Sequence, residues 1–321
     1  MSTTSVNIVC EQIRHHDNIA ISGHEFPDGD SIGACLALAI AINGMGKKVW
    51  AVIDDCGEKY KVIPGQQFIY RGDVNELNPG LFICVDCPSP DRLGKAAVLL
   101  EKTTEVVCID HHKNDGLFAK YNYIDSDASA ACELVFHVLD WMGIMSPDTA
   151  SAIYAGIVYD TGGFLHQNTT PECLDIVSGL ISLGIPFTNI YNVMLKERTL
   201  NAAKMFGLVL SRLKLQGGIC YSYITQQDLI SEGATIDDLD QISNELLTTK
   251  DAVVSVFVYE KSENFSKASF RSRDIDVREI AKSFGGGGHE RAAGANMYSS
   301  AKEALPVVIE KIREAIDNCE K

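Results

Sequence analysis

The chain of 321 residues is long enough for two domains, and its composition, 46% hydrophobic and 22% charged, is that of a globular protein with a sizeable core. Its formal net charge of −15 argues against a protein that coats long nucleic acid, because that role needs a basic surface. A small anionic substrate is compatible with this charge, since bound divalent cations dominate the local field and are themselves attracted by acidic clusters.

The ten cysteines lack the regular spacing of a disulfide framework, and residues 1–7 lack the basic-then-apolar pattern of a signal peptide. The longest apolar run, residues 33–42, is about half the length that a membrane span needs. We therefore expect reduced thiols in a cytoplasmic protein that does not enter membranes. Cys84 and Cys87 form a lone CxxC, which favours buried thiols over a zinc site.

Short apolar runs and helical periodicities alternate along the first half of the chain. Residues 18–22, 48–53, 81–86 and 106–110 are predicted to be buried strands. The apolar residues at positions 32, 36, 39 and 40 share one helical face, and similar patterns predict helices over 130–142, 147–158 and 171–183. This alternation predicts an α/β domain with a mainly parallel sheet over residues 1–186.

The pattern changes after residue 186. A long helical stretch of mixed charge, residues 187–215, is expected to be a helical linker and a candidate hinge. Strands are predicted over 219–224, 252–259 and 266–270, and helices over 277–284 and 301–318. Residues 216–321 are therefore expected to form a smaller α+β domain.

Side chains with metal-binding chemistry follow the first predicted strand. His24, Asp28 and Asp30 lie beyond its carboxyl end, which is where ligands bind in open α/β sheets. Pro27 and Gly29 provide the turn that lets these side chains converge. The alternative is that the two aspartates only cap the next helix.

Two further strands also end in polar side chains. Asp86 follows an apolar run, and a carboxylate there is costly unless it is paired or bound to a metal, although it could simply open the turn before Pro88. Asp110, His111 and His112 end another strand and suit a metal ligand with its orienting partner. A polar loop with a satisfied histidine is the alternative.

Asp160 ends a predicted helix, where the following small residues leave room for a ligand or simply stop the helix. Together these signals place at least five oxygen and nitrogen ligands at the ends of elements of one domain, too many for one catalytic ion. They predict a pair of Mn²⁺ or Mg²⁺ ions about 3.5–4 Å apart, which would clamp a phosphoryl group and lower the pKa of a bridging water.

The second domain carries a basic segment, with seven Lys or Arg against five Asp or Glu between residues 261 and 291. Arginines bind phosphate oxygens through paired hydrogen bonds, and the amides of consecutive glycines can cradle an anion. A surface hairpin with exposed arginines is the alternative. The candidate substrate-binding residues are Arg271, Arg273, Gly286, Gly287, Gly288 and His289.

These motifs, in this order, resemble the DHH phosphoesterase family, named after a triplet that is present here as Asp110-His111-His112. The other motifs read GHEFPDGDSIG, Asp86 and YDTGGF, while RSR and GGGGHERAAGA look like the family's DHH-associated substrate domain. The resemblance covers nearly the whole chain. Within the family, the sequence is most similar to the bacterial oligoribonucleases that also dephosphorylate 3′-phosphoadenosine 5′-phosphate (pAp).

The resemblance implies a site for two Mn²⁺ ions bridged by Asp86, with Mg²⁺ or Co²⁺ as alternatives. One ion would be held by His24, Asp28 and Asp86, and the other by Asp30, Asp86, His111 and Asp160. His112 would contact the substrate phosphate or assist the leaving group, and Arg271 and His289 would hold the nucleotide.

The expected activity is hydrolysis of short oligoribonucleotides and linear dinucleotides to mononucleotides, and of pAp to AMP, in a cleft too narrow for long chains. The same residues would serve a cyclic-dinucleotide phosphodiesterase, or a pyrophosphatase or exopolyphosphatase. A catalytically silent nucleotide sensor is the non-enzymatic alternative. The oligomeric state is left open, with a homodimer as one alternative.

Overall fold

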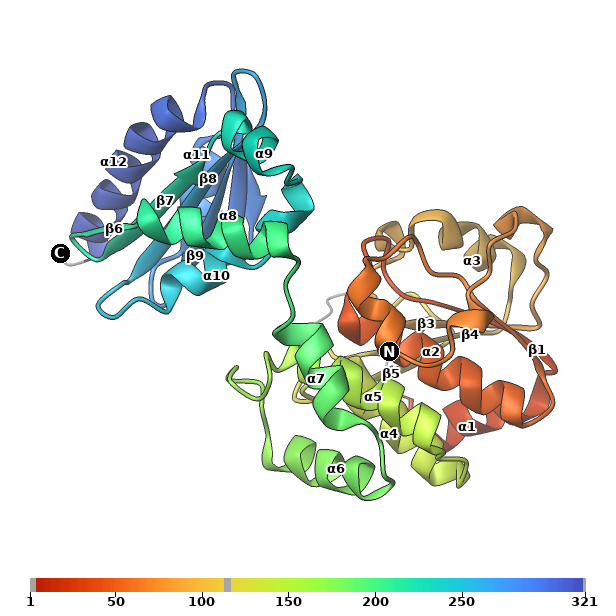
Figure 1. Ribbon diagram of the computed structural model, residues 1–321. Coiled ribbons are helices and arrows are strands. Elements are labelled where there is room, and N and C mark those ends of the chain that lie inside the picture. The colour runs from red at the N-terminus through yellow and green to blue at the C-terminus, as the bar shows by residue number, and fades with distance from the viewer. Residues whose placement is uncertain (1–3, 113–116, 320–321) are drawn as a thin grey trace. The chain divides into compact units, whose positions relative to one another are not determined.

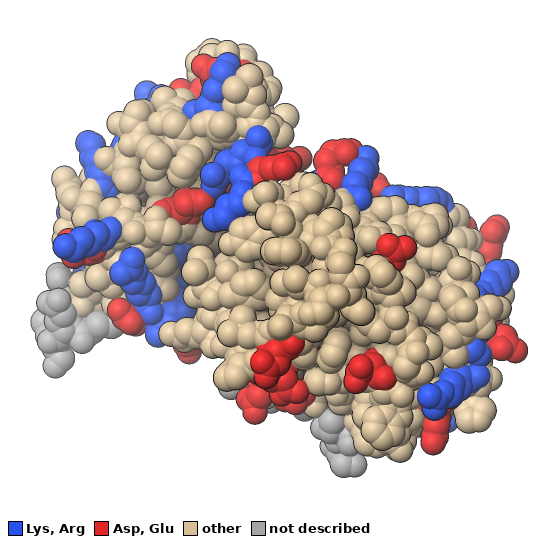
Figure 2. All heavy atoms as spheres, turned by 60° about the horizontal axis from the view of Figure 1, so that its bottom comes forward, with Lys and Arg blue, Asp and Glu red and all other residues tan. Residues whose placement is uncertain are grey.

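The computed structural model describes residues 4–112 and 117–319 (Figure 1). The chain divides into two compact units, Met1–Glu197 and Arg198–Lys321. No helix of the described residues combines the length and apolar character needed to cross a bilayer. On the face shown in Figure 2, the acidic and basic side chains of the described residues are scattered among neutral ones.

The first unit is built on a five-stranded parallel sheet with the order β2-β1-β3-β4-β5. Its strands are β1 (Asn18–Ser22), β2 (Lys48–Ala51), β3 (Leu81–Val85), β4 (Val106–Asp110) and β5 (Tyr121–Ile124). The chain passes from β1 to one neighbour, β2, and then returns to the other, β3. The carboxyl ends of β1 and β3 therefore flank the position at which open α/β sheets bind ligands.

Helices accompany this sheet throughout the first unit. They are α1 (Val6–His15), α2 (Gly29–Gly44), α3 (Val98–Lys102), α4 (Ala131–Met142), α5 (Pro147–Asp160), α6 (Pro171–Ser182) and α7 (Phe187–Leu195). Helix α2 is apolar on nearly all sides and almost completely buried, as expected for a helix inside a core.

Close packing of α2 against α5 depends on glycine. A Cβ atom at Gly33 of α2 would lie 2.6 Å from the carbonyl oxygen of Ala152 of α5, and one at Gly156 of α5 would lie 2.8 Å from the Oδ1 atom of Asp30 of α2. Since neither distance is possible for a real side chain, these two glycines let the helices approach each other. The approach brings the N-terminal turn of α2 next to the C-terminal end of α5, where the site is formed.

The second unit contains a mixed six-stranded sheet with the order β10-β11-β9-β8-β7-β6. Its strands are β6 (Lys214–Gln216), β7 (Ile219–Ile224), β8 (Val254–Ser262), β9 (Phe265–Ser272), β10 (Gly287–Gly288) and β11 (Ala292–Met297). Its helices are α8 (Leu200–Ser211), α9 (Gln226–Glu232), α10 (Ile242–Leu247), α11 (Val277–Ser283) and α12 (Ala301–Cys319). One hydrophobic cluster joins α11 and α12 to one face of the sheet, and another joins α8, α9 and α10 to the opposite face.

The predicted fold class is confirmed: an α/β unit with a parallel sheet precedes a smaller α+β unit. The predicted thiols of Cys84 and Cys87 are buried and free. Residues 187–215, predicted to be a linker, are shared between the two units, since α7 lies in the first and α8 and β6 lie in the second. The sequence patterns missed four helices, α1, α3, α9 and α10, and four strands, β5, β6, β10 and β11.

Candidate metal centre

The loop after β1 brings His24 and Asp28 together at the start of α2. Asp28 caps this helix, because its Oδ1 atom accepts hydrogen bonds from the backbone N–H groups of Asp30 (3.0 Å) and Ser31 (3.2 Å). The same Oδ1 atom lies 4.0 Å from the Nε2 atom of His24. Capping and metal binding are therefore compatible roles for Asp28, and the helix fixes the position of the carboxylate.

Asp86 lies at the centre of the site, directly after β3. Its side chain is buried; its Oδ2 atom is 3.5 Å from Nε2 of His24 and its Oδ1 atom is 3.6 Å from Nε2 of His111. Its backbone has a φ of 49°, in the left-handed region that few residues other than glycine adopt. This backbone conformation ends the extended path of β3 directly before the carboxylate that lies between His24 and His111.

A second group of ligands forms around His111, at the end of β4. Its Nε2 atom lies 3.9 Å from Oδ2 of Asp30 and 3.8 Å from Oδ2 of Asp160. Asp30 is held by the N-terminus of α4, where its two carboxylate oxygens accept hydrogen bonds from the N–H groups of Ala131 (2.6 Å) and Cys132 (2.9 Å). A helix N-terminus favours negative charge, so these two N–H groups offset part of the cost of burying this carboxylate.

The six predicted ligands thus form two adjacent groups that share one edge of the sheet. In each group, one ligand atom from every member lies within 4.8 Å of the others. The first group is His24, Asp28 and Asp86, and the second is Asp30, His111 and Asp160. Asp86 also lies close to His111, so it stands between the two groups.

The protonation energetics of these side chains fit a site for cations. Burial, followed by the charge of Asp86, raises the pKa of Asp28 and raises that of Asp30 well above its usual value. Burial also raises the pKa of Asp160, to about 6. The four carboxylates therefore cannot all be ionised cheaply by themselves, and divalent cations would relieve the repulsion.

His111 and Asp86 form the one strongly stabilised pair in the site. Burial opposes charge on both, but the attraction between them across 3.6 Å and the neighbouring charges outweigh it, so that the pKa of His111 is raised to about 10 and that of Asp86 is lowered to about 2. The Nδ1 atom of His24 is buried without a hydrogen-bond partner among the described residues. Carboxylate and imidazole donors without thiolates suit Mn²⁺ or Mg²⁺.

His112 differs from the six ligands because its side chain is 41% exposed. Its Nδ1 atom is 2.8 Å from Oδ1 of the fully buried Asp110, and the hydrogen bond between them raises the pKa of His112. Asp110 therefore orients the ring and favours its protonated form. The exposed edge of His112 remains available to a ligand beside Asp86, whose Oδ1 atom is 3.5 Å from the same Nδ1 atom.

One residue that contacts a candidate metal ligand carried no sequence signal. The side-chain amide of Asn168 donates to Oδ2 of Asp160 (3.2 Å) and to the carbonyl oxygen of Ser129 (2.8 Å). It therefore fixes the carboxylate of Asp160 relative to the segment before α4. A lone asparagine in a polar loop has no pattern that distinguishes it from a turn residue.

In the second unit, Arg271 and Arg273 occupy different environments. Arg271 extends from β9 and donates from Nε to Oδ1 of Asn244 (2.5 Å), while burial lowers its pKa and the charge of Asp240 opposes this effect. Arg273 is exposed and donates to the carbonyl oxygen of Leu247 (2.9 Å). Arg271 is therefore the more fixed of the two predicted phosphate ligands.

The glycine run forms a hairpin rather than an open cradle. Gly287 pairs with Gly294 and Gly288 with Ala293, while the exposed His289 lies in the turn. The N–H of Gly286 donates to Ala281. In the same way the N–H of His289 donates to the carbonyl oxygen of Ala292. These two N–H groups are therefore already hydrogen-bonded within the protein, and fewer amides of the glycine run can bind an anion than the sequence predicted.

A pocket of about 360 Å³ lies against this hairpin. Lys261 and Lys267 line it together with residues 285–287 and 294–296. Two of the basic side chains predicted in this segment therefore lie next to the glycine run.

Comparison with known proteins agrees with this organisation. The model of the DHH family N-terminal domain matches residues 18–157, and that of the DHHA1 domain matches residues 216–318. The bifunctional oligoribonuclease and PAP phosphatase NrnA of Thermus thermophilus is 30% identical over 303 residues, which cover 93% of this chain and 90% of that protein. The chain belongs to the DHH family.

Two further similarities extend over nearly the full chain. NrnA of Mycoplasma genitalium is 28% identical over 99% of this chain and 100% of that protein. The crystal structure of an exopolyphosphatase-related protein from Bacteroides fragilis superposes with a TM-score of 0.90 at 25% identity, covering 98% of this chain and 97% of that one.

Proposed function

We propose that this DHH-family protein is a two-metal phosphoesterase that hydrolyses short oligoribonucleotides and linear dinucleotides to mononucleotides, and pAp to AMP. The observation that carries the proposal is the convergence of four mutually repelling carboxylates and three histidines at the switch point of the parallel sheet. The similarity to two NrnA proteins supports the nucleotide substrate.

Two Mn²⁺ ions are the cofactors that we expect at this site. His24 and Asp28 would hold one ion, Asp30, His111 and Asp160 would hold the other, and Asp86 would bridge them. When bound, the ions supply charge for the phosphoryl oxygens and lower the pKa of a water that can attack phosphorus.

The protein groups that act on the substrate are His112 and Arg271. His112 is held by Asp110, which favours the protonated ring, so that it can donate a hydrogen bond to a phosphate oxygen or a proton to the leaving oxygen. Arg271, with Arg273 and the hairpin of residues 286–289, would bind and orient the nucleotide through its phosphates.

The test is product analysis with Mn²⁺ on linear diadenylate, pAp, cyclic di-AMP, longer RNA and pyrophosphate. Asp86→Asn is the inactive variant, and Asp175→Asn, which changes an exposed acid on α6, is its matched control. Release of mononucleotides from diadenylate and of AMP from pAp supports the proposal. Turnover of pyrophosphate alone would assign the protein to the pyrophosphatases, cleavage of cyclic di-AMP alone to the cyclic-dinucleotide phosphodiesterases, and tight nucleotide binding without turnover to the sensors.

A further inference from the structure

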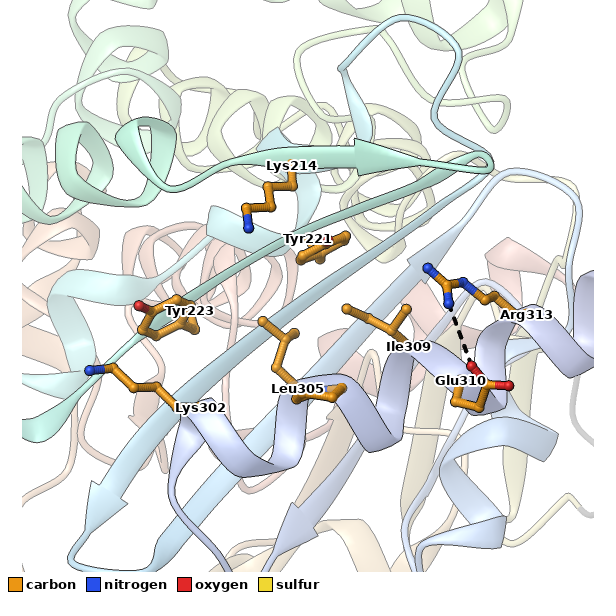
Figure 3. Close-up of a pocket in the computed structure, with 9 residues that line it drawn as sticks. Lys214, Tyr221, Tyr223, Lys302, Leu305, Ile309, Glu310 and Arg313 are labelled. Atoms are coloured by element: carbon orange, nitrogen blue, oxygen red, sulfur yellow. Dashed lines mark hydrogen bonds and ion pairs between the residues drawn. The ribbon is translucent and has the colours of Figure 1, made fainter.

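A separate groove of about 410 Å³ lies in the second unit between strands β6 and β7 and helix α12 (Figure 3). Tyr221 and Tyr223 are two residues apart on β7, so both point to the same side of the sheet, toward Leu305 and Ile309 of α12. These four side chains give the groove an aromatic and aliphatic floor, in which Tyr221, Leu305 and Ile309 are buried and Tyr223 is partly exposed.

The groove and Arg271 lie on opposite faces of the sheet. Tyr221 is paired with Val256, and Val256 is paired with Phe270. Paired residues share a face, whereas Arg271 follows Phe270 directly and therefore points the other way. The groove is thus distinct from the surface that carries Arg271.

Positive charge surrounds this apolar floor. Lys214 extends from β6, while Lys302 and Arg313 extend from α12. The only carboxylate in the lining is that of Glu310, which is 3.5 Å from Arg313. Lys214 and Lys302 have no salt-bridge partner among the described residues, although the chain carries a net charge of −15. A local excess of unpaired cations is complementary to an anion.

The aromatic rings are held in place before any ligand arrives. The guanidinium of Arg212 lies 4.9 Å from the centre of the Tyr223 ring and is itself fixed by paired hydrogen bonds to Asp228 (2.5 and 2.8 Å). The hydroxyl of Tyr221 donates to Oε1 of Gln216 (3.0 Å). Because these rings are already ordered, a ligand that packs on them loses little binding energy to ordering them.

We propose that this groove is a second nucleotide-binding site, in which a base packs on the partly exposed Tyr223 and a phosphate is bound by Lys214, Lys302 and Arg313. Aromatic platforms beside basic side chains are the features by which proteins bind single-stranded nucleotides without reading their sequence. The volume falls in the range of small-molecule sites, about 300–1,000 Å³, and accepts one nucleotide or the end of a short chain.

The experiment is calorimetric titration of AMP into the full-length chain carrying Asp86→Asn, which prevents turnover of contaminating substrate. Two changes, Lys302→Glu and separately Tyr223→Leu, are expected to weaken AMP binding at this site by about tenfold or more. Lys250→Glu, at an exposed lysine elsewhere in the second unit, should leave it unchanged. Arg271→Ala should remove only binding at the opposite face.

Circular dichroism of each variant establishes that it is folded, and hydrolysis of diadenylate by Lys302→Glu in the otherwise native chain should remain at the native rate. The proposal is overturned if Lys302→Glu and Tyr223→Leu leave AMP binding unchanged, or if inorganic phosphate binds this site as tightly as AMP. It is also overturned if Lys302→Glu changes only the oligomeric state in sedimentation, because the groove would then be a contact between copies of the chain. None of these results depends on the catalytic activity proposed above.

Discussion

Two regions of the molecule contain the same electrostatic arrangement with opposite sign. One is the group of carboxylates at the carboxyl ends of the strands in the first unit, and the other is the group of basic side chains around β9 in the second. At the strand ends, burial and neighbouring negative charge raise the pKa values of Asp28, Asp30 and Asp160. On β9, burial and the positive charges of Lys261 and Arg271 lower the pKa of Lys267. In each region, buried side chains of like charge lie close together, and their repulsion makes the charged forms unfavourable.

The comparison shows where the molecule needs ligands of opposite charge. A third region, the Arg212–Asp228 pair, shows the contrasting case, because there the protein itself supplies both charges. Groups that satisfy each other hold the fold together, whereas groups that repel one another are set to bind cations in the first unit and phosphates in the second.

The largest expected effect is that of Asp86→Asn, which removes the charge between the two ligand groups. We expect phosphoesterase activity to fall by more than about 100-fold, beyond the 10–100-fold typical of residues that only support metal ligands. Mn²⁺ binding measured by calorimetry should fall with it. Native activity in this variant, with Asp175→Asn as the control, would show that the carboxylate cluster is not the metal centre.

Arg271→Ala tests the proposed phosphate binding by the second unit. Loss of a charged hydrogen-bond donor costs about 1.5–3 kcal/mol, so kcat/KM for diadenylate should fall by about 10–150-fold. Mn²⁺ affinity should stay the same, because all the candidate metal ligands belong to the first unit and Arg271 belongs to the second. If metal binding weakened equally, the separation between a cation-binding unit and a phosphate-binding unit would be wrong.

Asn168→Ala is expected to act within the first unit alone. The amide of Asn168 holds Oδ2 of Asp160, so its loss should weaken Mn²⁺ binding by about tenfold, the lower end of the range for groups that orient a metal ligand. Excess Mn²⁺ should restore activity. Gln167→Ala, which removes an adjacent exposed amide, is the control, and equal effects from the two variants would contradict the role of Asn168.

The smallest effect is expected at the paired charges. Hydrogen bonds from Arg212 hold the pKa of Asp228 well below its ordinary value, so the pair stabilises the second unit above a pH of about 4 and loses this effect as the pH falls further. Asp228→Asn should therefore lower the stability of the second unit by about 1–2 kcal/mol at pH 7 and by less near pH 2.

Hydrogen exchange across β7 and α9 measures this local stability, since both tryptophans, Trp50 and Trp141, lie in the first unit and report on it instead. Asp237→Asn, at an exposed acid of the second unit, is the control. A destabilisation that does not depend on pH would show that the loss reflects packing and not charge.

The fold was largely predictable because its apolar runs are long and regular. Strand β1 has the predicted bounds and α11 matches to within one residue. Missed elements such as β5 and β11 have weaker patterns: β5 is a four-residue edge strand, and β11 (AAGANM) is rich in small residues that alone favour no strand. Only pairing with β9 and β10 makes β11 a strand.

The metal-ligand candidates were predictable because each one lies just after a strand or at an end of a helix, and parallel strands bring their carboxyl ends together. The supporting contacts were not, since Asn168 reaches Asp160 through the folded loop and Asp30 is held by a helix about 100 residues later in the chain. The glycine run misled in part, because its amides are engaged in a hairpin that only tertiary pairing reveals.

The left-handed backbone of Asp86 restricts which amino acids the position can hold before any chemistry is considered. Asparagine and glycine adopt that conformation readily, whereas valine, isoleucine and threonine do so at considerable cost. In a saturation library selected only for soluble expression, Asp86 should therefore tolerate Asn and Gly and exclude the β-branched residues, and a second selection for activity should return aspartate alone. The backbone conformation would then restrict position 86 to a few amino acids, and the requirement for activity would restrict it further to aspartate.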